Sequence, residues 1–206
     1  QKMDHLDHQE LLSSFPSNLF PTLWETQIEA LEYIARLDGN VTLEAPTGIG
    51  KTLVGVTFLE ALKKRDIGPL FYTTINKTLV EQVKAQHPHV AIAEGRNAHP
   101  CLYYNSEVSA DDVPCSMLKD CAHRVDQESG QTFENGAVPC PYLLQKFQAK
   151  QSPIVVSTLH FYLFTQLFSK EWPQPAGLVI DEAHRAARTV RNALTYEITD
   201  YHISQI

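Results

Sequence analysis

The chain has 206 residues, of which 43% are hydrophobic and 20% charged, and its formal net charge is −7 at pH 7. These values are typical of a globular protein long enough for one domain and a small insert. The apolar runs are too short to span a membrane, and the polar start at Gln1 is unlike a secretory signal. The net negative charge excludes a surface that is basic overall, but it is compatible with a local groove that binds nucleic acid. We expect a cytoplasmic protein, or a nucleoid-associated one in a bacterium.

The first part of the chain alternates helical and strand patterns. A short helix is expected over Leu6 to Leu12, and Leu23 to Leu37 carries apolar residues at three- and four-residue steps, which predicts a helix with one buried face. After a turn at 38–40, the expected elements are strand 41–43, helix 53–64, strand 70–74, helix 76–84 and strand 90–93. This order predicts an α/β domain with a parallel sheet and flanking helices.

The alternation stops between Gly95 and Pro139, where no periodicity is sustained. A segment of this length inside a compact domain is either functional or a separate module. Beyond it, the expected elements are helix 142–149, strand 154–157, helix 159–168, strand 177–180 and a helix from 186 into the tail. We therefore predict an insert at 95–150 between two parts of one α/β domain, 1–94 and 151–206.

A glycine-containing loop, Ala45 to Thr52, lies between the first expected strand and the next helix. Its sequence, Ala-Pro-Thr-Gly-Ile-Gly-Lys-Thr, matches a nucleotide-binding P-loop, except that Ala45 replaces the usual first glycine. The glycines let successive N–H groups point at one anion, and the following helix adds its positive dipole end. The predicted phosphate-binding residues are Pro46, Thr47, Gly48, Ile49, Gly50, Lys51 and Thr52.

Two carboxylates follow the last expected strand, in Asp181-Glu182-Ala183-His184. A P-loop enzyme needs an acidic group at the end of a neighbouring strand to hold Mg²⁺. We assign that role to Asp181, together with the Thr52 hydroxyl. Glu182 is placed to orient or deprotonate the attacking water. Together with Lys51, these two carboxylates are the predicted catalytic residues for ATP hydrolysis.

The P-loop and the Asp-Glu-Ala-His sequence together resemble the first motor domain of a superfamily 2 helicase, in which the second sequence is the DEAH form of motif II. The resemblance implies a RecA-like fold. It also implies that His184 couples the nucleotide site to the nucleic-acid site and that Gln27, upstream of the loop, contacts adenine. Thr73, Thr74 and Lys77 match the next motif, where the strand end and the following loop touch the nucleic-acid backbone.

All four cysteines, Cys101, Cys115, Cys121 and Cys140, lie in the insert, separated by 13, 5 and 18 residues. Disulfides are not expected in a cytoplasmic ATPase. The spacing alone leaves three alternatives open: a [4Fe–4S] cluster, a Zn²⁺ site, or free thiols. A bound metal would help to fold a segment with little apolar content.

The position of the insert resembles that in the iron–sulfur helicases related to XPD and DinG, which carry four cysteines between the P-loop and DEAH. Gly95-Arg96-Asn97 before the first cysteine and Val138 to Tyr142 around the last one also resemble that family. This resemblance favours the [4Fe–4S] cluster. It also suggests that basic residues of the insert, among them Arg96 and Lys146, neutralise nucleic-acid phosphates.

We therefore expect an ATP-dependent DNA helicase that moves 5′ to 3′ on single strands, unwinds forked duplexes, and acts as a monomer with repair or replication proteins. The chain ends soon after His184, before the second motor domain that the resemblance implies. We expect a fragment of a longer protein that hydrolyses ATP weakly alone. The alternative is a metal-stabilised nucleic-acid-binding or regulatory module whose nucleotide site does not drive a motor.

Overall fold

The structure, a computed structural model, describes residues 6–37, 39–115, 117–169 and 171–195. Asp38 of the predicted turn and residues 196–206 of the predicted tail lie outside this range. The helices and strands are α1 (His8–Ser13), α2 (Glu25–Arg36), α3 (Lys51–Lys64), β1 (Leu70–Thr74), α4 (Lys77–Gln86), β2 (Ala91–Ile92), α5 (Pro141–Gln151), β3 (Ile154–Thr158), α6 (Leu159–Phe168), β4 (Gly177–Ile180) and α7 (Ala186–Leu194). Short 3-10 helices lie at Arg96–Ala98, Leu102–Tyr104, Ala110–Asp112 and Ala183–Arg185.

The four strands form one parallel sheet in the order β2-β3-β1-β4. β1 lies inside the sheet and pairs with β3 on one side and β4 on the other, so that Tyr72 is aligned with Val156 and Val179. Parallel strands need crossover connections, and here helices supply most of them. The sheet and its helices confirm the predicted α/β class and agree with a RecA-like domain.

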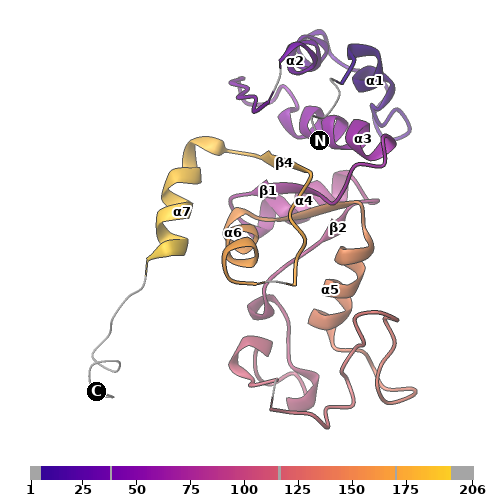
Figure 1. Ribbon diagram of the computed structural model, residues 1–206, viewed down its shortest axis with the longest axis vertical. Coiled ribbons are helices and arrows are strands. Elements are labelled where there is room, and N and C mark those ends of the chain that lie inside the picture. The colour runs from indigo at the N-terminus through magenta and orange to yellow at the C-terminus, as the bar shows by residue number, and fades with distance from the viewer. Residues whose placement is uncertain (1–5, 38, 116, 170, 196–206) are drawn as a thin grey trace.

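Two layers of helices cover the sheet (Figure 1). α3 and α4 pack on the face that carries Leu70 and Tyr72 of β1. α5 and α6 pack on the opposite face, against Phe71 and Val155. Because successive strand side chains point to opposite faces, the unbroken apolar run in β1 fills both cores.

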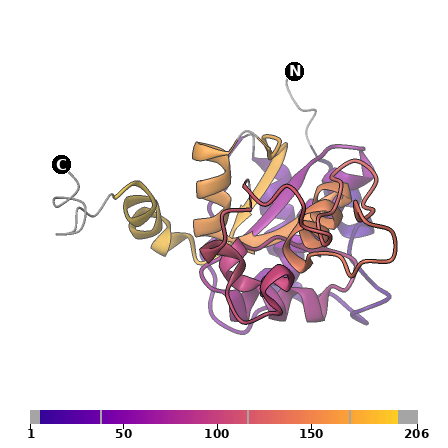
Figure 2. The same ribbon diagram turned by 90° about the horizontal axis from the view of Figure 1, so that it is seen from below.

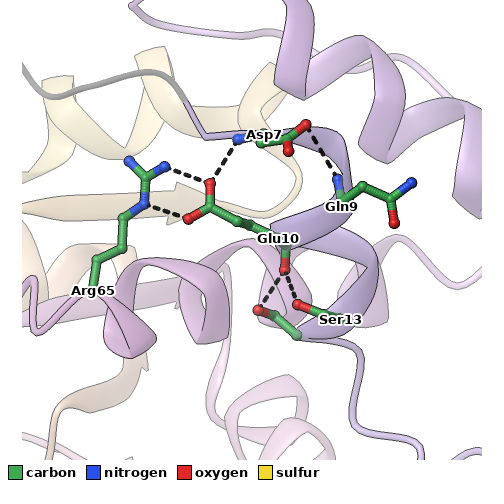
Figure 3. A network of polar contacts seen from close by, with 6 residues as sticks. Asp7, Gln9, Glu10, Ser13 and Arg65 are labelled. Atoms are coloured by element: carbon green, nitrogen blue, oxygen red, sulfur yellow. Dashed lines mark hydrogen bonds and ion pairs between the residues drawn. The ribbon is translucent and has the colours of Figure 1, made fainter.

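The N-terminal helices α1 and α2 lie on the outer side of α3, away from the sheet (Figure 1). Leu11 and Leu31 are fully buried there. Figure 3 shows the polar contacts that fix α1: the Asp7 N–H donates to Glu10 Oε2 at 2.8 Å, and Arg65 at the end of α3 binds both carboxylate oxygens of Glu10. The Arg65 guanidinium lowers the pKa of Glu10, so the ion pair links the α1 start to the α3 end.

The predicted strand at Val41–Leu43 is wrong. These residues lie in no strand, and no ladder hydrogen bond joins them to β4 in the part of the chain that the structure describes. Leu43 instead packs against the apolar cluster formed by α1, α2 and α3. A run of three residues offers at most two side chains to one face of a sheet, and here the neighbouring helices bury its leucine.

The rest of the insert lies beyond its helix α5, on the far side of the sheet from α1 and α2 (Figure 1). It is held mostly by turns, with isolated bridges between Pro100 and Ser109 and between Val125 and Thr132. α7 projects to the side, next to α6 (Figure 2). Within the described residues, no helix is both long and apolar enough to cross a membrane.

His87, at the end of α4, is fully buried beside the ring of Phe20, at 5.5 Å between ring centroids. Neither ring nitrogen has a hydrogen-bond partner among the described residues. Burial, and then the neighbouring His89, lower the pKa of His87 from 6.5 to about 4. The folded protein therefore holds this imidazole neutral where the unfolded chain would protonate it.

We predict that the free energy of unfolding falls as the pH drops from about 6.5 toward about 4, because only the unfolded chain takes up the His87 proton in this window. The slope from this one group is at most about 1.4 kcal/mol per pH unit. In His87→Phe, urea unfolding should lose this part of the pH dependence, whereas replacement of the exposed His160 by Ala should leave it intact. Identical pH profiles for wild type and His87→Phe would contradict the assignment.

Candidate nucleotide site and cysteine cavity

The glycine loop leads directly into α3, as the sequence predicts. Gly48 and Gly50 have φ angles of +87° and +79°, in the left-handed region that favours glycine. Gly50 caps α3, and its carbonyl accepts from the N–H groups of Leu53 and Val54 at 3.0 and 3.2 Å. The amino end of a 14-residue helix therefore faces the loop, which is the arrangement that binds phosphate.

Two side chains hold the loop in shape. Lys51 Nζ donates to the Ala45 carbonyl at 3.1 Å, which joins the two ends of the loop. Gln27 of α2 is only 3% exposed, and its Nε2 donates to the Ile49 carbonyl at 2.9 Å. Its Oε1 accepts from the Trp24 N–H at 2.9 Å. The structure thus places Gln27, the predicted adenine contact, against the peptide backbone of the loop.

Gln27 and Gly50 fit closely together. A β-carbon added to Gly50 would lie 2.4 Å from Gln27 Nε2, too close for any real contact. Glycine at this position therefore serves two needs, a positive φ and space for the glutamine amide.

Asp181 and Glu182 follow β4, at the carboxyl edge of the sheet. The Asp181 N–H donates to the Thr73 carbonyl at 2.9 Å, which extends the pairing of β4 with β1 by one residue. The chain then turns sharply, because Glu182 adopts a left-handed conformation with φ +55°, and its N–H donates to Asp181 Oδ1 at 2.9 Å. His184 Nδ1 lies 3.4 Å from Glu182 Oε2. Ligands of open parallel sheets bind at this edge.

Tyr72 of β1 is buried where α3 packs on β1 and β4. A β-carbon added to Gly55 of α3 would lie 2.9 Å from Tyr72 Cε2 and 3.0 Å from Val179 Cγ1 of β4, so the three elements pack closely here. Burial raises the pKa of Tyr72, and the negative charge of Asp181 raises it further. Thr52, on the first turn of α3, and Asp181, after β4, therefore belong to elements that pack on each other. A hydroxyl and a carboxylate are oxygen ligands that suit Mg²⁺, so the two residue types fit the predicted ion.

The four cysteines line one cavity of about 290 Å³ in the insert. Cys101 is 7% exposed, and Cys115 Sγ accepts from Arg96 Nη2 at 3.2 Å. Cys140 is the residue before α5, and burial raises the pKa of its thiol, although N–H groups of α5 lower it in part. His123 also lines this cavity.

The cysteines are not grouped as ligands of a single ion. Among the residues that the structure describes, no three histidine, cysteine or acidic side chains form a group that could hold one metal ion. Leucine and tyrosine residues line the same cavity as the four cysteines. A compact tetrahedral Zn²⁺ site of the kind considered from the sequence is therefore not formed in this conformation.

Two basic residues of the insert, Arg96 and Lys146, are used inside the protein, contrary to the prediction that they neutralise phosphates. Arg96 donates to the carbonyls of Ala110 and Val113, and so fixes the loop that carries Cys115. Lys146 is 8% exposed and forms an ion pair with Glu171. Long basic side chains with buried stems and satisfied donors are not free for phosphate contacts.

Two of the three predicted nucleic-acid contacts are also buried. The Thr73 hydroxyl donates to the Val179 carbonyl at 3.0 Å, and the Thr74 hydroxyl donates to the Asn76 carbonyl at 3.0 Å. Both side chains are 0% exposed, so neither hydroxyl can reach a phosphate in this conformation. Lys77, the first residue of α4, is exposed.

A family comparison agrees with this geometry. Residues 21–204 match the model of the family described as "Type III restriction enzyme, res subunit". The match covers most of the chain, so the protein belongs to this family, whose domain is a superfamily 2 helicase-like motor domain. A search among curated proteins finds no match. The superfamily predicted from the P-loop and the Asp-Glu-Ala-His sequence is therefore confirmed.

We predict that Gln27→Leu loosens the phosphate-binding loop. The substitution keeps the side-chain volume but leaves the Ile49 carbonyl and the Trp24 N–H without their partner, which should lower the free energy of unfolding by about 1–2 kcal/mol. Hydrogen exchange of the loop amides should also become faster. Gln82→Leu, at an exposed position of α4, is the matched control and should change neither quantity. Unaltered stability and protection in Gln27→Leu would show that the glutamine does not support the loop.

Proposed function

We propose that the protein is the first motor domain of an ATP-dependent DNA helicase. The observation that carries this proposal is the packing of α3, which begins at the P-loop, on β4, which leads into Asp181 and Glu182. Loop glycines at positive φ, a helix start and two strand-end carboxylates form the arrangement that phosphoryl transfer needs. Family membership supports the same class of motor.

In this proposal each group has a distinct role. The N–H groups of residues 47–50 surround the phosphates, and Lys51 exchanges its bond to the Ala45 carbonyl for the β- and γ-phosphates. Thr52 and Asp181 hold Mg²⁺, which neutralises charge on the phosphates. Glu182 accepts a proton from the attacking water, and its left-handed backbone turns its side chain away from the direction of β4.

His184 supports a link between hydrolysis and the rest of the domain. It lies 3.4 Å from the Glu182 carboxylate and is followed by α7, which packs on α6. A change in the position of Glu182 during the reaction would therefore alter the surroundings of His184 and the start of α7. We assign to this path the coupling role that the helicase resemblance implies.

The cysteine cavity supports a [4Fe–4S] cluster as the resident metal centre. A cluster of iron and sulfide ions is larger than one ion, so its thiolate ligands stand further apart around a shared space. Four cysteines lining one cavity fit that requirement. Arg96 and the N–H groups at the start of α5 are placed to stabilise thiolate charge. This feature supports the XPD- and DinG-like type, with 5′ to 3′ movement and a role in repair.

The nucleic-acid contacts proposed here keep only part of the set that the sequence predicts. Lys77 remains a phosphate contact because it is exposed. On the insert, Tyr104 and Phe133 are 44% and 69% exposed, and Arg124 lies 5.8 Å from the centre of the Phe133 ring. Exposed aromatic rings beside a guanidinium are suited to stacking on unpaired bases. We therefore place the single strand along the insert.

The proposed function predicts an ATPase activity that single-stranded DNA stimulates in the full-length protein. Lys51→Ala should reduce this activity by about 100-fold, because a phosphate-binding charge is lost from the transition state. The rate of phosphate release with and without DNA measures the effect. Lys64→Ala, at the far end of α3, is the matched control and should keep the wild-type rate. Equal rates for wild type and Lys51→Ala would favour the alternative, a regulatory or nucleic-acid-binding module without a motor.

We also predict about four iron and four acid-labile sulfide per chain after anaerobic purification. Cys140→Ser should lose most of the iron, because the cavity would keep only three thiolate ligands. His123→Ala should retain it, because four cysteines complete the ligand set. Elemental analysis and the visible absorption spectrum provide the measurement. One equivalent of zinc without iron would rule out the cluster.

A further inference from the structure

Glu171 is the one residue outside the insert that lines the cysteine cavity, among the residues that the structure describes. It lies between α6 and β4, next to Trp172, which is 8% exposed. The Trp172 ring packs edge-on against Phe71 of β1 and Phe161 of α6, at 6.1 and 5.8 Å between ring centroids. The buried tryptophan therefore fixes the main chain that carries Glu171 beside the cavity.

Lys146 of α5 lines the same cavity and forms an ion pair with Glu171. It follows Tyr142 by four residues, so the two side chains lie on one face of α5, and the Lys146 ammonium is 6.0 Å from the centre of the Tyr142 ring. Lys146 is only 8% exposed, and an ammonium group is rarely buried to this extent without a negative partner. Glu171, whose side chain is 61% exposed, supplies that partner at the edge of the solvent.

One carboxylate uses only part of the hydrogen-bonding capacity of this ammonium group. A lysine side chain carries three N–H donors. Within residues 6–37, 39–115, 117–169 and 171–195, the hydrogen bond to Glu171 is the only one that Lys146 Nζ makes. Because the group is buried, solvent screens its charge little. Lys146 is therefore a source of positive potential for the thiols that share the cavity.

Negative charge enters this cavity when the four thiols ligate the metal centre proposed above. A [4Fe–4S] cluster supplies one-electron redox chemistry, and its reduction potential depends on the net charge around it. Lys146 then lies between two negative neighbours, Glu171 on one side and the ligating thiolates on the other. The ammonium charge favours an added electron in the cavity, and the Glu171 carboxylate opposes it.

We propose that Lys146 and Glu171 set the reduction potential of the metal centre from opposite directions: the ammonium group raises the potential, and the carboxylate lowers it. This inference rests on the proposed [4Fe–4S] cluster and adds two residues that are not its ligands. In the reduction, one electron passes from an external one-electron donor to the metal centre, and no bond of the protein forms or breaks. Groups around metal ligands commonly tune a metal centre through their charge and hydrogen bonds.

A purely structural ion pair would join the insert to the segment before β4 and do no more. Removal of either partner would then weaken the same contact, so the two substitutions would act in the same direction. Tuning by charge predicts opposite effects instead, because an unpaired Glu171 and an unpaired Lys146 leave charges of opposite sign beside the cavity. The sign of the shift in potential therefore separates the two roles.

The test measures the midpoint potential of the anaerobically purified full-length protein, by titration with dithionite and redox mediators followed by electron paramagnetic resonance. Lys146→Gln should lower the potential, so that the ratio of reduced to oxidised protein at a fixed potential falls about tenfold, a shift of about 59 mV. Glu171→Gln should raise the potential by a similar amount. The double variant, which removes both charges, should have a potential near that of wild type.

Lys150→Gln is the matched control. Lys150 lies one turn further along the same face of α5, 5.9 Å from the centre of the Trp172 ring, and it is not among the described residues that line the cavity, so its loss should shift the potential much less. Unchanged potentials in both single variants, shifts in the same direction, or loss of iron from both would overturn this inference and leave the proposed cluster standing. If one single variant loses its iron, the other decides by the sign of its shift. A wild-type protein without iron would overturn the proposed cluster and this inference with it.

Discussion

The parallel pairing of β4 with β1, under α3, is the constraint on which the site depends. The last bond of this pairing, from the Asp181 N–H to the Thr73 carbonyl, fixes where β4 ends. Gly55 brings α3 within contact distance of both strands. Backbone packing therefore fixes the distance between α3, which follows the candidate phosphate-binding loop, and β4, which leads into the two carboxylates. A side chain at Gly55 would separate them, because Tyr72 and Val179 already occupy that space.

The sequence predicts the elements of the domain better than it predicts the partners of individual side chains. Helical periodicity and strand composition correctly indicate α2, β1 and β4, because long apolar patterns report burial directly. The three-residue run 41–43 is too short to show a periodic pattern of apolar residues, and Leu43 packs among helices instead. Thr73 and Thr74 match a motif by position, but the sequence does not show that their hydroxyls donate to nearby carbonyls.

The residues of the candidate site differ in the same way: some can be predicted from local motifs, and others depend on contacts between distant parts of the chain. Lys51, Asp181 and Glu182 could be assigned from local motifs, since each follows a recognisable turn or strand end. The support that Gln27 gives to the loop depends on a contact with Ile49, 22 residues away, and the packing of Tyr72 and Val179 against Gly55 depends on three elements meeting. No local pattern reports such contacts. The shared cavity of the cysteines is likewise a product of turns that have no periodicity.

One side chain, that of Gln145, connects the two ends of the insert. Gln145 of α5 accepts from the Glu94 N–H at 3.0 Å and donates to the Glu94 carboxylate at 3.3 Å, and His99 Nε2 lies 3.2 Å from Gln145 Oε1. The chain entering the insert is therefore fastened to the helix that leaves it. Since α5 also packs on β2 and β3, the insert is connected to the sheet through this helix. A single strand bound along the insert would thus act on the same sheet whose carboxyl edge carries Asp181 and Glu182.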